Sequence, residues 1–334
     1  MTDLDGPPAA LVELAAIRAA AVTLRGVALR TPLVPFGRPE DRMLLKAESL
    51  QPIGAFKIRG AYVAVAGLDP AARARGVITY SSGNHAQGVA RAARLLGAPA
   101  VVVMPSDAPA IKRARVEADG AEVVVVGTAS DERQRVAEAI AADRDLSIIP
   151  PYDDDRIIAG QGTVGLEIVE EEPDVALVVV PIGGGGLAAG AATAVKAVHP
   201  TARVIGIESE LAGDAQESLA TGAIVRWDAD RVSRTIADGT RTQSIGVRTF
   251  AHLRVALDGV LTVTEAEIVA AVRLAAERSR LVVEPSGALT IAALAFHARE
   301  LGHDPSRGPS VAVVSGGNVD PTAYRGYLAT PLPD

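Results

Sequence analysis

Short apolar, β-branched runs alternate with longer segments of helical period from about residue 77 of the sequence onward. The predicted strands are residues 76–80, 100–104, 121–126, 176–181, 203–207 and 310–315. The predicted helices include residues 87–96, 131–142, 186–198, 265–278 and 286–301. This alternation is typical of βαβ units, in which crossover helices cover both faces of a parallel sheet. We therefore predict an α/β fold.

The sharpest change in composition along the chain is the segment PPYDDD at residues 150–155. Before it, the units between about residues 77 and 148 could form a small separate sheet, and a longer series of strands and helices follows it. The closing residues TPLPD read as a short tail, so no C-terminal regulatory domain is expected.

Charge and cysteine content exclude several classes of protein. The net charge is −7 and the basic residues form no block, so neither nucleic acid nor a membrane surface is an expected partner. We expect small molecules, or a second copy of the chain in a homodimer. The absence of cysteine excludes disulfides, thiolate nucleophiles and Cys-ligated metals. Neither a signal peptide nor an apolar run of about 18 residues occurs, which predicts a cytoplasmic protein.

Residues 183–186 are four consecutive glycines between a predicted strand and a helix that begins near Leu187. Glycines let several backbone N–H groups point the same way, and the helix N-terminus adds positive potential, so this loop can bind a phosphate. A plain tight turn would rarely need four glycines. The glycine spacing, with Ala189 and Glu208 further along, also fits a dinucleotide-binding fingerprint, so a nicotinamide-dependent dehydrogenase is a rival interpretation.

Lysine is scarce, and Lys46, Lys57, Lys112 and Lys196 are the only four in the chain. Lys57 lies in the run GAFKIRG, where a predicted turn gives way to a helix. The positive pole of the helix dipole disfavours a charged amine at that end, which lowers the pKa of the amine. A lysine of lowered pKa is suited to Schiff-base chemistry, although a solvated surface lysine explains this motif equally well.

Two further polar loops follow predicted strands. SSGNHAQ at residues 81–87 offers hydroxyls, an amide and helix-start N–H groups that suit a carboxylate ligand, whereas a plain N-cap needs one such residue. SGGN at residues 315–318 lies at the carboxyl edge of the sheet, where ligands bind, although an ordinary glycine-rich loop is the better interpretation of this run taken alone. Together with Lys57, the three loops suggest a phosphate-bearing aldehyde cofactor. A Ser-His-Asp hydrolase is poorly supported, because no G-x-S-x-G elbow occurs.

Six runs occur in a fixed order along nearly the whole chain: GAFKIRGA, SSGNHAQG, GGGGL, IADG, VEPSGA and SGGNVD. With this ordered set, the chain resembles the pyridoxal-phosphate (PLP) enzymes of the serine/threonine dehydratase and serine racemase family, of fold type II. The resemblance implies two open, twisted, mostly parallel sheets covered by helices. It further implies a large PLP-binding domain of residues 1–70 and 149–334, and a smaller mobile domain of residues 71–148 that closes over the substrate.

The resemblance also implies roles for individual residues. Lys57 would join the cofactor as an imine and act as the base at the substrate Cα, with Ser82 as a second base on the opposite face. The remaining cofactor-binding residues would be Phe56, Asn84, Gly183, Gly184, Gly185, Gly186, Leu187 and Ser315. The substrate-binding residues would be Ser81, Ser82, Asn84 and His85. A serine at the ring nitrogen does not enforce a pyridinium, so the electron sink is weak and favours rapid loss of a β-leaving group.

Glu208, Ala212 and Asp214, in the run IESELAGD, match the metal site of racemase-like members of this family. Two carboxylates and a main-chain carbonyl are hard oxygen ligands suited to Mg²⁺, Ca²⁺ or Mn²⁺. A helix cap at Asp214 and a solvated Glu208 are the alternative. Ile53 and Ala55 stand where the family often has Thr and Ser, which leaves the preferred substrate side chain open.

We therefore expect an ammonia-lyase that converts L-threonine, L-serine or both to a 2-oxo acid and ammonia. Within the family, the alternatives are an amino-acid racemase and a 3-hydroxyaspartate ammonia-lyase, of which the latter needs an extra cation for the distal carboxylate. From other classes, a nicotinamide-dependent (NAD) dehydrogenase and a non-catalytic phosphate-ligand binder remain. The dehydrogenase gives no role to Lys57 or to the SSGNH loop, and the binder gives none to the imine.

Overall fold

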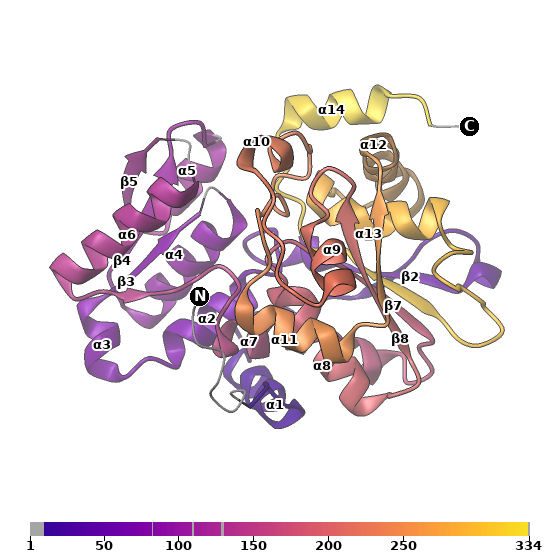
Figure 1. Cartoon of the computed structure of the whole chain (residues 1–334), viewed down its shortest axis with the longest axis horizontal. Coiled ribbons are helices and arrows are strands. Elements are labelled where there is room, and N and C mark those ends of the chain that lie inside the picture. Colours follow the sequence, from indigo (N-terminus) through magenta and orange to yellow (C-terminus); the bar gives the residue numbers. More distant parts are fainter. Residues whose placement is uncertain (1–9, 82, 109, 128–129, 333–334) are drawn as a thin grey trace.

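Two β-sheets covered by helices make up the structure, a computed structural model that describes residues 10–332 apart from 82, 109 and 128–129 (Figure 1). The larger sheet has six strands and the smaller has four, and all pairings except one are parallel. The predicted α/β class with two mostly parallel sheets is confirmed. Among the described residues, no helix has the length and apolar character needed to cross a bilayer.

The six-stranded sheet combines strands from both ends of the chain. In order across the sheet, they are β1 (Leu33–Pro35), β2 (Met43–Lys46), β10 (Ser310–Val313), β7 (Leu177–Pro181), β8 (Arg203–Ser209) and β9 (Gly259–Val263). Only the edge pair β1–β2 is antiparallel. The central strand β10 pairs with β2 on one side and β7 on the other, so segments far apart in the sequence are neighbours.

The four-stranded sheet is continuous in sequence. Its order is β5 (Glu122–Val126), β4 (Ala100–Pro105), β3 (Val77–Tyr80) and β6 (Ser147–Ile148). The helices associated with this part are α2 (Ile58–Ala66), α3 (Pro70–Arg75), α4 (Asn84–Leu96), α5 (Ala110–Ala118) and α6 (Ser130–Arg144). All four strands lie inside the range predicted for the smaller domain, and the mobility of that domain stays a prediction.

The larger sheet is buried on both faces, because its strands alternate between two apolar clusters. Val178 and Val180 face one cluster, whereas Leu177 and Val179 face the other. Such strands read as continuous apolar runs, and this is why they were recognisable in the sequence. The first face is covered by α1 (Leu14–Thr23), α7 (Asp155–Glu171), α8 (Gly186–Val198), α9 (Asp214–Thr221) and α11 (Val247–Ala256). The second face is covered by α12 (Glu265–Leu274), α13 (Pro285–Phe296) and α14 (Pro321–Ala329).

Several short elements complete the chain. They are the 3₁₀ turns η1 (Pro39–Asp41) and η2 (Glu48–Leu50), the short helix α10 (Ala229–Val232) and the π turn η3 (Ala275–Ser279). Three predicted helices differ from the structure by three residues or more at one end. The helix predicted over residues 87–96 begins earlier, at Asn84. The helix predicted over residues 265–278 passes into the π turn after Leu274, and the one predicted over 286–301 ends at Phe296.

Helix α7 packs unusually close to α2 and α8 because glycines line the contacts. A Cβ on Gly160 would lie 2.6 Å from the Cα of Gly60 in α2. On the side facing α8, a Cβ on Gly165 would lie 2.3 Å from the carbonyl oxygen of Ala191. Real side chains essentially never approach so closely, so these helices keep their spacing only with glycine. The packing places the start of α2, and with it Lys57, beside the large sheet.

A buried cluster of ion pairs fixes the same end of α2. Arg59 is 1% exposed, and its guanidinium donates two hydrogen bonds of 2.8 Å to the carboxylate of Glu48. It donates two more, of 2.6 and 2.9 Å, to Glu167 of α7. Burial would raise the pKa of Glu48, but the charge and hydrogen bonds of Arg59 outweigh burial and hold that pKa below its ordinary value. Lys46 of β2 adds an ion pair of 2.8 Å to Glu167.

Replacing Arg59 with Met is expected to lower the free energy of unfolding by about 3–5 kcal/mol, because it leaves Glu48 buried without its cation. Arg30→Met is the matched control, since the ion pairs of Arg30 with Glu170 and Glu171 lie at the surface and should contribute about 1 kcal/mol or less. Denaturant unfolding of both variants measures the difference. Equal losses of stability in the two variants would contradict this account of the cluster.

Candidate active site

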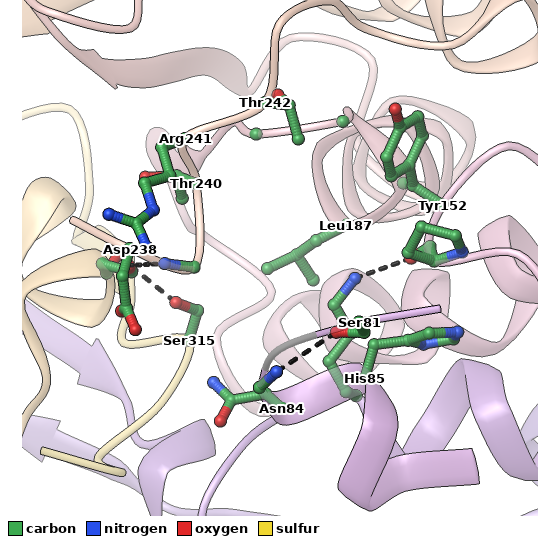
Figure 2. Close-up of a pocket in the computed structure, with 18 of the residues that line it drawn as sticks. Ser81, Asn84, His85, Tyr152, Leu187, Asp238, Thr240, Arg241, Thr242 and Ser315 are labelled. Carbon is green, nitrogen blue, oxygen red and sulfur yellow. Dashed lines mark hydrogen bonds between the residues drawn. The ribbon is translucent and has the colours of Figure 1, made fainter. Parts of the chain in front are cut away.

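A pocket of about 250 Å³ lies where the carboxyl ends of strands from both sheets meet (Figure 2). Ser81 follows β3 in the smaller sheet, and Gly183 and Ser315 follow β7 and β10 in the larger one. The pocket therefore brings together all three polar loops that the sequence singled out. Lys57, at the start of α2, also lines it.

Lys57 is held with its amine inside the pocket. Its Nζ donates a hydrogen bond of 2.6 Å to the main-chain carbonyl of Pro151 and lies 5.2 Å from the ring centre of Phe56. Burial lowers the pKa of Lys57 from 10.5 to about 8. The sequence argument reached the same direction from the helix dipole, and loss of water around the amine is a cause that it left out.

The glycine loop occupies the turn between β7 and α8, and its glycines are required by crowding. Gly185 has a φ of +93°, in the left-handed region that favours glycine. A Cβ on Gly184 would lie 2.1 Å from the ring of Tyr152, and one on Gly183 would lie 2.9 Å from the Cα of Thr240. The loop is further held by the hydroxyl of Thr249, which donates a hydrogen bond of 2.8 Å to the carbonyl of Gly184. The backbone N–H groups at the start of α8 thus border a cradle that suits a phosphate.

The predicted contacts of the cofactor ring lie around the same cavity. Ser315 is buried, and its hydroxyl donates a weak hydrogen bond of 3.4 Å to the carbonyl of Ser286. The main-chain N–H of Phe56 donates to the carbonyl of Ser315 at 3.0 Å, which ties the lysine loop to the last strand. Asn84 begins α4, and its amide donates a hydrogen bond of 2.6 Å to Glu284. Phe56, Asn84 and Ser315 all line the pocket, and their roles toward the cofactor stay predictions.

The predicted substrate loop is described at Ser81, Asn84 and His85, whereas Ser82 lies outside the described residues. The hydroxyl of Ser81 accepts a hydrogen bond of 3.3 Å from the N–H of Gly83. His85 is 2% exposed, and its Nε2 lies 3.1 Å from the carbonyl of Ile149. Burial, together with the nearby charge of Lys57, lowers the pKa of His85 to about 3, so the ring is neutral and offers no positive charge to a carboxylate.

Several residues that line the pocket were not predicted from the sequence. Lys112 of α5 makes an ion pair of 2.6 Å with Asp238, which belongs to the IADG run. Glu284, from the VEPSGA run, is buried, and burial raises its pKa to about 7. Asp238 and Glu284 belong to runs that the family resemblance had already pointed out. Lys112 and Arg133 lie in no such run, so no local sequence pattern predicts that they line the pocket. Arg133, Tyr152 and Arg241 complete the wall of the pocket.

Ile53 and Ala55, which depart from the family pattern, are buried away from the described walls of the pocket. Ala55 instead forms an isolated antiparallel bridge with Gly316. Both positions therefore contribute to the packing of the loop before Lys57.

The three residues predicted to hold a metal lie together at the start of α9. Glu208 is fully buried, and its carboxylate accepts hydrogen bonds from the N–H groups of Ala215 and Gln216 at 3.0 and 2.8 Å. The solvated Glu208 of the alternative interpretation is therefore wrong. Both carboxylate oxygens of Asp214 are buried without a hydrogen bond of good geometry. Within the described part of the chain, no group of three or more acidic or histidine side chains could hold a metal ion.

Comparison with known proteins identifies the family. Residues 24–316 match the family described as pyridoxal-phosphate dependent enzyme. The chain is 40% identical to an L-threo-3-hydroxyaspartate ammonia-lyase of Saccharomyces cerevisiae, over 88% of this chain and 90% of that protein. It is 46% identical to an L-threonine ammonia-lyase of Geobacter sulfurreducens, over 82% of this chain and 67% of that protein. The structure of maize serine racemase superposes with a TM-score of 0.88 at 35% identity, covering 95% of this chain and 97% of the racemase.

These matches and the pocket define a PLP-dependent enzyme of fold type II. The chain belongs to the pyridoxal-phosphate dependent family that includes the threonine ammonia-lyases and serine racemases. Pyridoxal phosphate fits the residues present, because the backbone of the glycine loop and the amine of Lys57 line the same pocket. The dehydrogenase interpretation is not supported, since the chain matches a pyridoxal-phosphate family and both carboxylate oxygens of Glu208 accept hydrogen bonds from the start of α9.

The pKa of Lys57 can be measured in the cofactor-free protein. Competitive acetylation between about pH 6 and 11, read by peptide mass spectrometry, should show Lys57 losing its proton with a midpoint of about 8. Because the folded protein disfavours the charged amine, the reactive neutral fraction of Lys57 should already be large at pH 8. Lys196, which pairs with Asp258 outside the pocket, is the internal reference for the reagent. A midpoint for Lys57 at its ordinary value of 10.5 would contradict the burial argument.

Proposed function

We propose that this protein is an ammonia-lyase that converts L-threonine, L-serine or both to a 2-oxo acid and ammonia by β-elimination. The observation that carries the proposal is the buried amine of Lys57, with a pKa lowered to about 8, facing a glycine-lined cradle across one pocket. Support also comes from the ammonia-lyases among the relatives of the chain.

Pyridoxal phosphate, when bound, supplies an electron sink that makes the Cα proton of an attached amino acid acidic. Lys57 is suited to remove that proton, because a base works best when its pKa lies near the operating pH. The N–H groups of residues 183–187 would hold the phosphate at the start of α8. The hydroxyl of Ser315 would face the ring nitrogen. A hydroxyl there leaves the sink weak, which favours prompt departure of the β-hydroxyl group.

The substrate carboxylate would be held at the start of α4. Ser81 and Asn84 offer a hydroxyl and an amide there, and the first N–H groups of this helix of 13 residues add positive potential. The neutral ring of His85 supports this loop through its contact with the carbonyl of Ile149. We propose Ser82 as the second base, and with it racemisation as a side activity.

A specific observation favours 3-hydroxyaspartate as a second candidate substrate. Arg133 of α6 and Arg241 line the pocket from opposite parts of the molecule. Burial lowers the pKa of Arg133, Asp107 opposes this change, and the nearby charge of Arg241 lowers the pKa further. Two guanidinium groups that line one pocket attract an anion to it. A distal carboxylate on the substrate would supply that anion.

Lys57→Ala should lower formation of 2-oxo acid and ammonia from L-threonine by at least about 10²–10⁴-fold, the contribution of one general base. Lys196→Ala is the control, since Lys196 lies outside the pocket. Borohydride reduction followed by peptide mapping should place the cofactor on Lys57. Wild-type activity in Lys57→Ala, or a cofactor tag on another lysine, would overturn the proposal.

A substrate panel separates the candidates. The wild type is assayed with L-threonine, L-serine and L-threo-3-hydroxyaspartate, and with each enantiomer of serine for racemisation. If 3-hydroxyaspartate is a substrate, Arg133→Gln should lower its kcat/KM by roughly tenfold or more, because a hydrogen bond to a charged group is lost, and should affect L-threonine much less. Equal losses on both substrates would assign Arg133 to the α-carboxylate or to folding.

We also propose that a divalent cation binds Glu208, Asp214 and the carbonyl of Ala212. The residues fit such an ion, because their two carboxylates are buried near each other. Burial raises the pKa of Glu208, and the nearby charge of Asp214 raises it further. Both carboxylate oxygens of Asp214 are also buried without a hydrogen bond of good geometry. The ion would act on the loop before α9 and not in the chemistry.

Chelator should lower the melting temperature of the wild type, and Mg²⁺ or Ca²⁺ should restore it, with a stabilisation of about 2.7 kcal/mol at a hundredfold excess over Kd. Asp214→Ala should abolish this response. Glu210→Gln, an exposed carboxylate in the same run, should retain it. A wild-type melting temperature that is indifferent to both chelator and cation would show that these residues only cap a loop.

A further inference from the structure

Asn318, in the SGGN run after β10, connects three other segments of the chain. Its Nδ2 donates hydrogen bonds of 2.8 Å to the carbonyl of Ile53 and of 2.8 Å to the Oδ1 of Asn84. Its Oδ1 accepts a hydrogen bond of 2.5 Å from the guanidinium of Arg115. These partners lie on the loop before Lys57, at the start of α4 and on α5.

The chemistry of its partners fixes the orientation of the Asn318 amide. Two carbonyl-type oxygens face its NH₂ group, and a guanidinium, which can only donate, faces its oxygen. The same logic then fixes Asn84, since its Oδ1 is used by Asn318 and its NH₂ group donates to Glu284 at 2.6 Å. A turn of either amide would place like groups against each other at more than one contact.

One face of helix α5 contacts two loops, one before α11 and one after β10. Arg115 contacts Asn318, and Lys112, three residues earlier, pairs with Asp238 at 2.6 Å. Residues three apart lie on the same side of a helix, so one movement of α5 makes or breaks both contacts. Asn318 therefore connects α5 to the loop before Lys57 and to Asn84 at the start of α4.

We propose that Asn318 is a positioning residue that couples the seating of α5, through Arg115, to the orientation of Asn84 and of the loop before Lys57. The crowding of this contact supports the coupling. A Cβ on Gly54 would lie 2.4 Å from the Oδ1 of Asn318, and the N–H of Gly317 donates to the carbonyl of Gly54 at 2.9 Å. A shift of Asn318 must then move the lysine loop as well. The proposal relies on the proposed function only where it places Asn84 beside the cofactor.

Asn318→Asp removes the hydrogen bonds to Ile53 and Asn84 but keeps the one from Arg115. Aspartate has nearly the same shape and keeps an oxygen for Arg115, but it replaces the NH₂ group by an oxygen that faces two other oxygens. We expect the Kd of pyridoxal phosphate for the cofactor-free protein to rise roughly tenfold or more, as expected for the loss of two hydrogen bonds. The absorption spectrum of the bound cofactor should shift at the same time. Both readouts are independent of substrate turnover.

Arg115→Gln tests the link to α5 at an exposed position where the variant should fold. We expect KM for the amino-acid substrate to rise severalfold and the cofactor Kd to rise less than in Asn318→Asp, because Arg115 is lost but both hydrogen bonds donated by Asn318 remain. Arg113→Gln is the matched control, since Arg113 lies on the same helix but pairs with Glu117 within it, at 2.9 Å. In an Asn318→Ala background, Arg115→Gln should have no further effect on KM, because the partner is already absent.

The coupling is wrong if Asn318→Asp leaves the cofactor Kd and spectrum unchanged, or if Arg115→Gln raises KM equally with and without Asn318. Should the protein lack ammonia-lyase activity, the cofactor measurements still test the role of Asn318. The two proposals therefore fail separately.

Discussion

The buried ion pairs of Arg59 are the constraint on which the site depends. They tie α2 to η2 through Glu48 and to α7 through Glu167 at a point two residues beyond Lys57. A guanidinium suits this role because its flat fork satisfies two carboxylates at once and stays charged when buried. With Arg59 held, the backbone at Lys57 cannot move away from the pocket without breaking charged contacts in the interior.

The pocket needs that rigidity because its electrostatics depend on exclusion of water. Burial makes the amine of Lys57 easier to deprotonate and keeps His85 neutral. Around them, Lys112 is balanced by Asp238. A solvated pocket would return these groups to their ordinary pKa values, and Lys57 would then be a poor base near neutral pH. The two parts of the molecule must therefore meet closely for the chemistry to be available.

Features with a local cause could be predicted from the sequence, and those that depend on tertiary contacts could not. The fold class, Lys57 and the glycine loop were recognisable because strand period, helix starts and glycine runs are local signals. Strands β1 and β2 are only 3 and 4 residues long, and they are extended because they pair with each other and, for β2, with β10. The SSGNH run predicted a polar loop that binds a carboxylate. In the folded protein His85 is buried and contacts the main-chain carbonyl of Ile149, which the sequence alone does not show. Arg133 lies on an ordinary helix, and only the packing of α6 brings it to the pocket.

The strand order of the larger sheet has a consequence for how the chain folds during synthesis. The four-stranded sheet is complete once residue 148 has emerged, whereas the six-stranded sheet lacks its central strand β10 until residues 310–313 follow. Until then β2 and β7 have no common neighbour, and their edges stay open to wrong pairing. All strands of the smaller sheet are therefore available to the growing chain long before those of the larger one, and the cofactor site can be completed only after the last strand lies between its neighbours.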